Sequence, residues 1–191
     1  MDAIELLMQE HRTIEQVLEA LVSFSEEAIR TRRTDPAELA RFVSFLREFA
    51  DARHHAKEEG VLFQAMAEHG FPTRGGPIAV MLHEHEQGRA LVGSLAALAD
   101  QPGPWSDADL ARLGEASRSY AALLGAHIHK EDAVLYPMAE HHVPPEALEE
   151  VAVECRRMDA ADPTAGDRLM ALADELAAAH APGARLSRRI A

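Results

Sequence analysis

Two segments of the chain are near-copies of each other: HHAKEEGVLFQAMAEH at 54–69 and HIHKEDAVLYPMAEHH at 127–142. Each places a glutamate four residues after a histidine, Glu58 after His54 and Glu131 after His127. Residues four apart share one face of an α-helix, so each segment presents an imidazole and a carboxylate in the same direction. Imidazole nitrogens and carboxylate oxygens suit iron, manganese or zinc. The repeated spacing therefore indicates a metal site.

Two more histidines each follow a glutamate and lie on helical stripes whose other members are apolar. With them, the chain offers four imidazoles and two carboxylates that are expected to face the interior: His11, His54, Glu58, His85, His127 and Glu131. A buried carboxylate without a cation costs several kcal/mol, and the inward stripes contain no lysine. Arg89, four residues after His85, is a single cation and does not account for four histidines.

The number of donors predicts the number of metal ions. Six donors exceed the four ligands of a tetrahedral zinc site, whereas they suit two ions that each take two histidines. Glu58 and Glu131 are then expected to bridge two ions about 3.5–4 Å apart, with solvent completing the shells. Tyr120, two turns before His127, either lines the pocket of this site or packs within the bundle.

The other seven histidines are expected to lie outside the site. His55 shares its stripe with three acidic residues, so it is predicted to be solvated. His83 and His129 are two residues away from the inward stripes and point elsewhere. Four more are at helix ends, where they are expected to face water or the negative end of the helix dipole: His69, His141, His142 and His180.

Proline- and glycine-containing breaks divide the chain into four long and two shorter predicted helices: 2–32, 36–69, 77–99, 107–142, about 145–160 and about 165–180. Asp35 with Glu38 is expected to cap the second helix, and Ser106 with Asp109 the fourth. Short loops between long helices imply antiparallel neighbours. The sequence thus predicts an all-α fold, with an up-down-up-down four-helix bundle over 1–142. A helical extension at 143–191, ending in a frayed tail from 181, is expected to pack on it.

Helical periodicity also predicts which residues of the long helices face inward. For the second helix the inward stripe is Leu39, Val43, Leu46, Ala50, His54, Glu58, Val61 and Ala65. For the fourth it is Leu110, Leu113, Ser117, Tyr120, Leu124, His127, Glu131, Val134 and Met138.

Composition narrows the class of protein. The 191 residues carry a formal net charge of −13, which argues against nucleic acid and against an anionic membrane surface as partners. No apolar run approaches the roughly 18–20 residues of a membrane span. The N-terminus lacks the basic head and apolar run of a signal peptide.

The single cysteine, Cys155, excludes an internal disulfide and makes a reducing cytoplasm the expected location. Without a partner residue it is interpreted as packing rather than as a nucleophile.

Four stretches together resemble the hemerythrin-like, or HHE cation-binding, domain family: EHRTIEQVL at 10–18, HHAKEEGVLF at 54–63, PIAVMLHEHEQGRALV at 77–92 and HIHKEDAVLYPMAE at 127–140. The resemblance covers the chain from its N-terminus to about residue 142. It implies a four-helix bundle with a non-haem di-iron centre that meets dioxygen, nitric oxide or peroxide. Carried over residue by residue, the family pattern selects the same six donors as the helical stripes. Iron would be joined by an oxo, hydroxo or water bridge, and manganese and zinc are the alternative metals.

The chain departs from the oxygen-carrying members of that family. Those proteins have a His-x-x-x-His pair on the third helix, whereas this chain has Arg89 four residues after His85 and Met81 four residues before it. Asp132, five residues after His127, matches the acid spacing of the oxygen carriers, and Glu131 does not. These differences weigh against reversible oxygen carriage and favour a reaction with nitric oxide or peroxide, iron sensing or plain iron binding.

Three functional alternatives stay open at this point. The chain is a di-iron protein that binds or senses a small molecule or iron, or an enzyme that turns over peroxide or nitric oxide. The third option is a metal that only stabilises the fold while the C-terminal helices dock a partner. Glu-x-x-His pairs of ferritin-like sites are absent from the sequence, and His83-Glu84 lacks the second histidine of a zincin because Gln87 takes its place.

Overall fold

The computed structural model describes residues 2–181, which form helices joined by short loops, with no strand among them. The first and third long helices are α1 (Ala3–Thr31) and α4 (Gly76–Ala99). The second is one continuous helix made of α2 (Pro36–Phe45), η1 (Leu46–His55), η2 (Glu58–Leu62) and α3 (Phe63–Glu68). The fourth joins α5 (Asp107–Lys130), η3 (Glu131–Leu135) and α6 (Tyr136–His142). Two further helices follow, α7 (Pro145–Ala161) and α8 (Pro163–His180).

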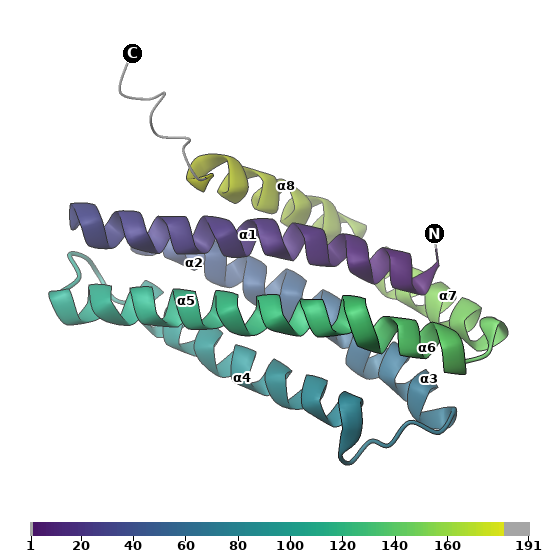
Figure 1. Cartoon of the computed structure of the whole chain (residues 1–191). Coiled ribbons are helices and arrows are strands. Elements are labelled where there is room, and N and C mark those ends of the chain that lie inside the picture. Colours follow the sequence, from purple (N-terminus) through teal and green to yellow (C-terminus); the bar gives the residue numbers. More distant parts are fainter. Residues whose placement is uncertain (1, 182–191) are drawn as a thin grey trace.

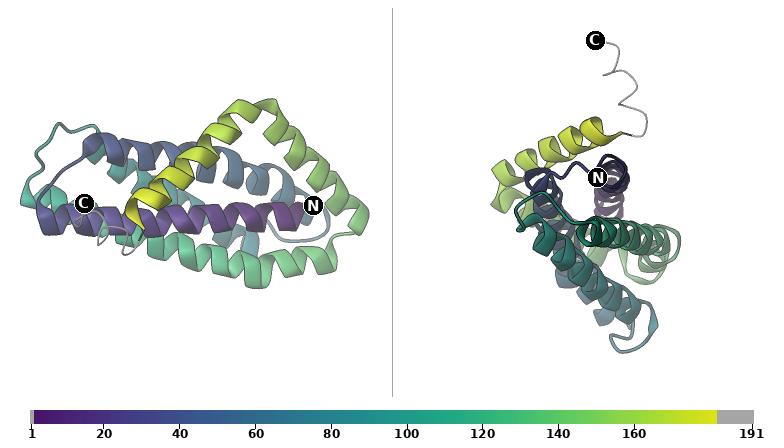
Figure 2. Two further views of the ribbon diagram at one scale, coloured as in Figure 1. Left: turned by 90° about the horizontal axis from the view of Figure 1, so that it is seen from above. Right: turned by 90° about the vertical axis from the view of Figure 1, so that its left-hand side faces the viewer.

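The four long helices run alternately in opposite directions and form an up-down-up-down bundle (Figure 1). In the end-on view of Figure 2 they surround a common interior, in which α5 lies next to both α1 and α4, and α4 lies next to α2. The all-α fold and the predicted helices are therefore confirmed, with helix ends that differ by one or two residues from the expected ones.

Side-chain caps fix where two of the long helices begin. The Ser106 hydroxyl accepts a hydrogen bond from the Asp109 amide, and the Asp109 carboxylate accepts one from the Ser106 amide, as expected. Asp35 also caps its helix through the Glu38 amide, at 2.9 Å. Glu38 does not return this bond, because its carboxylate binds Arg41 and His180 instead. The prediction for His180 is consequently wrong: the imidazole is buried against the bundle.

The C-terminal helices pack on the first half of the bundle. Helix α8 contacts both α1 and α2 and crosses them obliquely (Figure 2), and its Leu169, Ala173 and Leu176 join the same apolar core as Phe24 and Phe42. Helix α7 packs on α1, η2 and α3. The division into a bundle at 1–142 and an extension at 143–191 stays a prediction, and the expected frayed tail lies almost wholly outside the described residues. Among residues 2–181, no helix is long and apolar enough to cross a membrane.

The apolar interior consists of two clusters with a polar layer between them. One cluster holds Ile14 and Val92 together with Trp105, which precedes α5, and apolar residues of α8. The other holds Leu7 and Met81 and reaches the opposite end of the bundle. Along α1, His11 lies between Leu7 and Ile14, and along α4 His85 lies between Met81 and Val92. The buried histidines thus form a layer that apolar side chains close off on both sides.

Three segments of the long helices have π-helical hydrogen bonding: η1, η2 and η3. A π-turn closes at i→i+5 instead of i→i+4, so it shifts the inward face by one residue. The predicted inward stripes are correct up to the glutamates and wrong after them. Val134, expected inside, is 50% exposed, whereas Leu135 and Tyr136 are buried. On the second helix the buried residues after Glu58 are Leu62, Phe63 and Met66 rather than Val61 and Ala65.

Candidate metal centre

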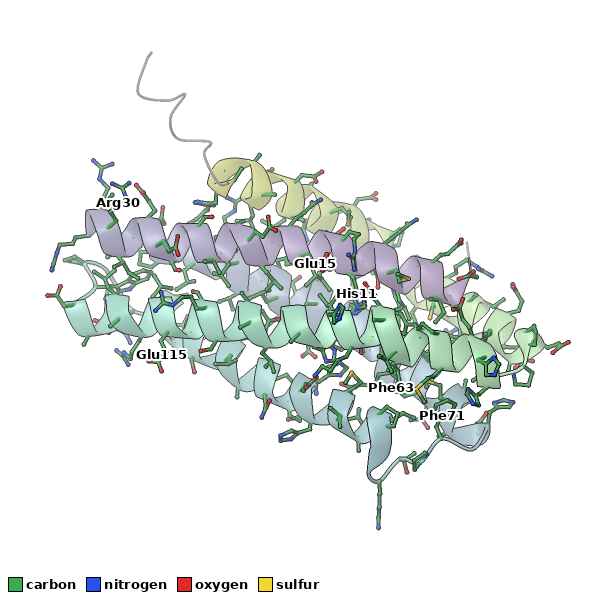
Figure 3. All side chains as sticks on the ribbon, viewed as in Figure 1. His11, Glu15, Arg30, Phe63, Phe71 and Glu115 are labelled. Carbon is green, nitrogen blue, oxygen red and sulfur yellow. The ribbon has the colours of Figure 1, made fainter. Side chains whose placement is uncertain are left out.

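The polar layer collects one histidine from each long helix. His11, His54, His85 and His127 are all buried, and Figure 3 shows His11 directed into the bundle from α1, whereas Arg30 of the same helix projects outward. Glu58 and Glu131 are fully buried in the same layer. The structure therefore brings together all six donors that the sequence selects.

A carboxylate holds the outer nitrogen of every one of these imidazoles. The Nδ1 atoms lie 2.7 Å from Asp132 in His11, 2.9 Å from Glu10 in His54, 2.7 Å from Glu59 in His85 and 2.9 Å from Glu84 in His127. Such a partner places the proton on Nδ1, orients the ring and leaves Nε2 as the inward-facing donor atom. Carboxylate–histidine pairs of this kind are the usual surroundings of metal-binding imidazoles.

Each buried glutamate lies between histidines of different helices. The Glu131 Oε2 atom is 3.3 Å from His11 Nε2 and 3.1 Å from His127 Nε2. The Glu58 Oε2 atom is 3.6 Å from His54 Nε2 and 3.4 Å from His85 Nε2. Both carboxylates therefore span the interval between the histidines of the first half and those of the second. This is the placement that two bridging ligands of a metal pair require.

The inward atoms fit a cation better than they fit one another. Glu58 Oε2 and both carboxylate oxygens of Glu131 are buried without a hydrogen-bond partner among the described residues. The Nε2 atoms of His85 and His127 face each other at 3.0 Å, and if both protons are on Nδ1, two lone pairs meet there. Unpaired buried carboxylates are strongly unfavourable. Positive charge between these atoms would remove both conflicts, and the donor set suits iron, manganese or zinc.

The pKa shifts show the same demand for positive charge. Burial lowers the pKa of His11, but the hydrogen bond to Asp132 and the nearby Glu131 carboxylate outweigh burial and raise that pKa to about 9. Burial acts likewise on His127, and the nearby Glu131 carboxylate outweighs it and raises the pKa of His127. Burial would raise the pKa of Glu58, yet the charge of His54 and the contact with His85 hold it well below its usual range. The raised pKa values of His11 and His127 favour their protonated, positively charged forms beside the two carboxylates.

Tyr136 is a member of the site that the sequence interpretation did not include. Its hydroxyl donates a 2.6 Å hydrogen bond to Glu58 Oε1, and its ring stacks on His11 with 5.5 Å between centroids. Regular helical periodicity selects Val134 at this level, and only the π-turns of η3 bring Tyr136 inward. A signal was present, because Tyr136 corresponds to the buried Phe63 in the other copy of the repeated segment.

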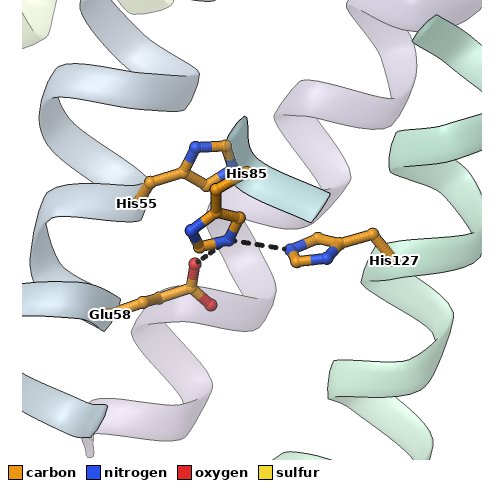
Figure 4. Close-up of side chains that lie close together, drawn as sticks. All are labelled: His55, Glu58, His85 and His127. Carbon is orange, nitrogen blue, oxygen red and sulfur yellow. Dashed lines mark hydrogen bonds and ion pairs between the residues drawn. The ribbon is translucent and has the colours of Figure 1, made fainter. Parts of the chain in front are cut away.

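His55 is the clearest error among the predictions from sequence. It was expected to be solvated, but it is 4% exposed and its ring lies face to face with that of His85 at 3.7 Å between centroids. Figure 4 shows the two rings beside Glu58 and His127. The π-helical segment η1 ends at His55, and its wider turns bring this residue inward while its ring still contacts Asp51 of the acidic stripe. Burial lowers the pKa of His55 to about 4.

Charged residues next to the donors have roles in positioning. Arg89 does not reach Glu58 or Glu131; it binds Asp51 at 2.8 Å and Glu59 at 2.7 Å. Glu15, four residues after His11, binds Arg12 at 3.0 Å. Arg12 also binds Asp132, the carboxylate partner of His11. Asp132 therefore orients His11 from outside the layer.

A cavity of about 220 Å³ lies beside the histidine layer, and its walls include Asp51, His55, Arg89 and Tyr120. Tyr120 lines this cavity and is buried within the bundle, so each of the two alternatives expected for it is met in part.

Cys155 is fully buried, and burial raises the pKa of its thiol to about 11. The interpretation of Cys155 as a packing residue is thus confirmed, whereas exposed His83 and His129 lie outside the layer as predicted.

Comparison with known proteins shows which family the chain belongs to. The sequence model of the hemerythrin HHE cation binding domain matches residues 2–139, which span the whole bundle. The chain is also similar to an iron-sulfur cluster repair protein, DnrN, from Neisseria gonorrhoeae. The two are 28% identical over 139 residues, which cover 69% of this chain and 85% of that protein. No solved structure gives a significant match.

Proposed function

We propose, because the chain belongs to the hemerythrin HHE cation-binding family, that its histidine layer holds a non-haem di-iron centre which binds or responds to a small molecule. The proposed ligands are the six inward donors: His11, His54, Glu58, His85, His127 and Glu131. His11 and His54 would serve one ion and His85 and His127 the other, with Glu58 and Glu131 as bridges.

One observation carries this proposal: each buried glutamate lies between an imidazole of the first half and one of the second, with unpaired oxygens turned toward both. Hydrogen bonds within the protein leave these oxygens unsatisfied, whereas two cations would satisfy all of them. Bound iron would supply redox chemistry and coordination of dioxygen, nitric oxide or peroxide. The protein would supply oriented imidazoles, a layer closed off by apolar side chains and the Tyr136 hydroxyl as a hydrogen-bond donor at Glu58.

A second candidate function is the supply or repair of iron-sulfur clusters, and the similarity to DnrN favours it. Under this proposal the centre gives up iron to a damaged cluster instead of retaining it. An enzyme that turns over peroxide or nitric oxide at the same ions is the remaining alternative. The three differ in what happens to iron and to the small molecule, so they are separable by experiment.

The first test is metal content. Protein reconstituted with Fe²⁺ under anaerobic conditions should hold two iron ions, and His54→Ala or Glu58→Ala should bind iron at least about tenfold more weakly because a ligand is lost. The exposed His83→Ala and His129→Ala are matched controls and should keep wild-type iron. Equal iron loss in all four variants, or none in any, would refute the proposed ligand set.

The second test separates the candidate functions. Iron-loaded protein is exposed anaerobically to nitric oxide, and separately to hydrogen peroxide while oxygen evolution and the near-ultraviolet bands are followed. One stoichiometric spectral change per centre indicates a binding or sensing protein, and many turnovers indicate an enzyme. Transfer of iron to an oxygen-damaged iron-sulfur protein, absent with His54→Ala, indicates repair.

A further inference from the structure

Every proposed ligand histidine is connected through its carboxylate to a positively charged side chain. The carboxylate accepts one hydrogen bond from the imidazole and another from the cation. The four series of histidine, carboxylate and cation are His11 with Asp132 and Arg12, His54 with Glu10 and Lys57, His85 with Glu59 and Arg89, and His127 with Glu84 and Lys130. One arrangement thus surrounds all four imidazoles.

The series that begins at His85 differs from the other three in the oxygen to which the cation binds. In the other three series the imidazole and the cation bind different oxygens of the carboxylate. Glu59 instead uses the single atom Oε1 for both His85 Nδ1 and the Arg89 guanidinium, each at 2.7 Å. A guanidinium on the accepting oxygen draws negative charge away from the other hydrogen bond. Glu59 therefore accepts less strongly from His85 than it would without Arg89.

Three carboxylates fix Arg89 at this oxygen. Its Nε atom donates to Asp51 at 2.8 Å, its Nη1 atom to Glu86 at 2.6 Å and its Nη2 atom to Glu59 at 2.7 Å. Asp51 belongs to η1, Glu59 to η2 and Glu86 to α4, so these bonds also join the second and third long helices. Turning the guanidinium away would break several charge-assisted hydrogen bonds at once. Arg89 is consequently a fixed part of the surroundings of His85.

We propose that Arg89 is a positioning residue that limits how strongly His85 donates electrons to a bound ion. This inference rests on the proposed di-iron centre and adds to it an inequality between the two ions. A carboxylate that accepts from Nδ1–H makes an imidazole a stronger metal ligand. Because Arg89 takes up part of the charge on Glu59 Oε1, the ion at His85 is less electron-rich than it would be with Glu59 alone. Weaker donation favours ferrous over ferric iron.

The test compares Arg89→Met with Lys130→Met in iron-loaded protein. Both changes remove one positive charge from a partly exposed side chain, 33% exposed in Arg89 and 39% in Lys130. Both also act on histidines of the same proposed ion, but Lys130 binds the Glu84 oxygen that His127 does not use.

The two variants should differ in midpoint potential, measured by spectroelectrochemical titration. Arg89→Met should shift the ferric-to-ferrous ratio about tenfold toward ferric iron, which is a fall of about 59 mV for a one-electron step. Lys130→Met should shift the ratio less than about threefold, because it removes a partly exposed ion pair and leaves the accepting oxygen unchanged.

A second readout requires no metal. In the metal-free protein, the Nδ1 proton of His85 should move downfield in the NMR spectrum of Arg89→Met, because its hydrogen bond to Glu59 becomes stronger. The Nδ1 proton of His127 should stay in place in the same variant. Glu59→Gln keeps the shape of the side chain and removes its charge, so it should move the His85 proton upfield.

The outcomes separate this inference from the proposed function. Wild type that does not hold two iron ions would overturn the proposed centre and the role of Arg89 with it. Where wild type holds two, equal shifts of potential in Arg89→Met and Lys130→Met would overturn only the role of Arg89, because they indicate a general effect of charge. A His85 proton that stays in place or moves upfield in Arg89→Met would also overturn it. Circular dichroism of the metal-free variants reports folding, and Arg89→Gln is the second variant if Arg89→Met does not fold.

Discussion

In the first half of the bundle Glu10 binds both His54 and Lys57, and in the second half Glu84 binds both His127 and Lys130. The residues match, yet their surroundings differ. Lys57 is fully buried and also contacts Asp159 of α7 at 2.8 Å, whereas the Lys130 side chain is 39% exposed. The C-terminal helices pack mainly on the first two long helices. We therefore expect burial, rather than residue type, to determine how much each lysine contributes to the free energy of unfolding.

Replacing the two lysines gives the largest expected contrast. Lys57→Met leaves Glu10 and Asp159 without their shared cation, so it should lower the free energy of unfolding by about 3 kcal/mol. Lys130→Met removes a partly exposed pair and should cost less than about 1 kcal/mol. Urea denaturation of the metal-free proteins measures both. Equal losses would mean that α7 and α8 do not change the environment of the first half.

Replacing Tyr136, one of the two aromatic residues beside the histidines, should have an intermediate effect on the free energy of unfolding. Tyr136 stacks on His11 and donates to Glu58, and its counterpart Phe63 lies parallel to His85 without a hydroxyl. Tyr136→Phe makes the halves alike and leaves the Glu58 oxygen without its donor, so it should cost about 2 kcal/mol in the metal-free protein. The loss should shrink when metal binds Glu58. Thermal unfolding with and without Fe²⁺ checks this, and an identical loss in both states would contradict it.

Thiol labelling measures how firmly the first half is covered. Cys155 on α7 is buried and its pKa is raised to about 11, so few thiolates exist at pH 8 and reagents have no path to them. Ellman's reagent should therefore react at pH 8 far more slowly than with a free thiol. The labelling rate should rise with pH up to about 11, because the fraction of Cys155 present as the reactive thiolate increases over that range. Rapid labelling of the native protein at pH 8 would show that α7 is readily displaced.

The sequence predicted the features that depend on regular helical geometry. Helix positions, the bundle and the convergence of His11, His54, His85 and His127 all follow from breaks in the chain and a period of 3.6 residues. Errors began where the period changes. The π-turns of η1 and η3 bring His55 and Tyr136 inward, and these turns depend on tertiary packing that a single helix does not reveal.

Carboxylates outside the layer were missed for a different reason. Asp132, Glu59 and Glu84 reach histidines on other helices, so their partners depend on how the helices are aligned along the bundle. Lys57 was likewise unassigned, because its second partner belongs to α7, which follows about a hundred residues later. Spacing within one segment carries no information on such contacts.

The series Asp159, Lys57, Glu10 and His54 joins a helix outside the bundle to an imidazole of the histidine layer through three successive polar contacts. Lifting α7 would admit water to Lys57 and release Glu10 from its fixed orientation, so His54 would hold its ion less tightly. Thermodynamic reciprocity then requires the converse: an occupied centre clamps α7 against the bundle. If the proposed centre holds metal, retention of that metal and attachment of the C-terminal helices are coupled through one equilibrium.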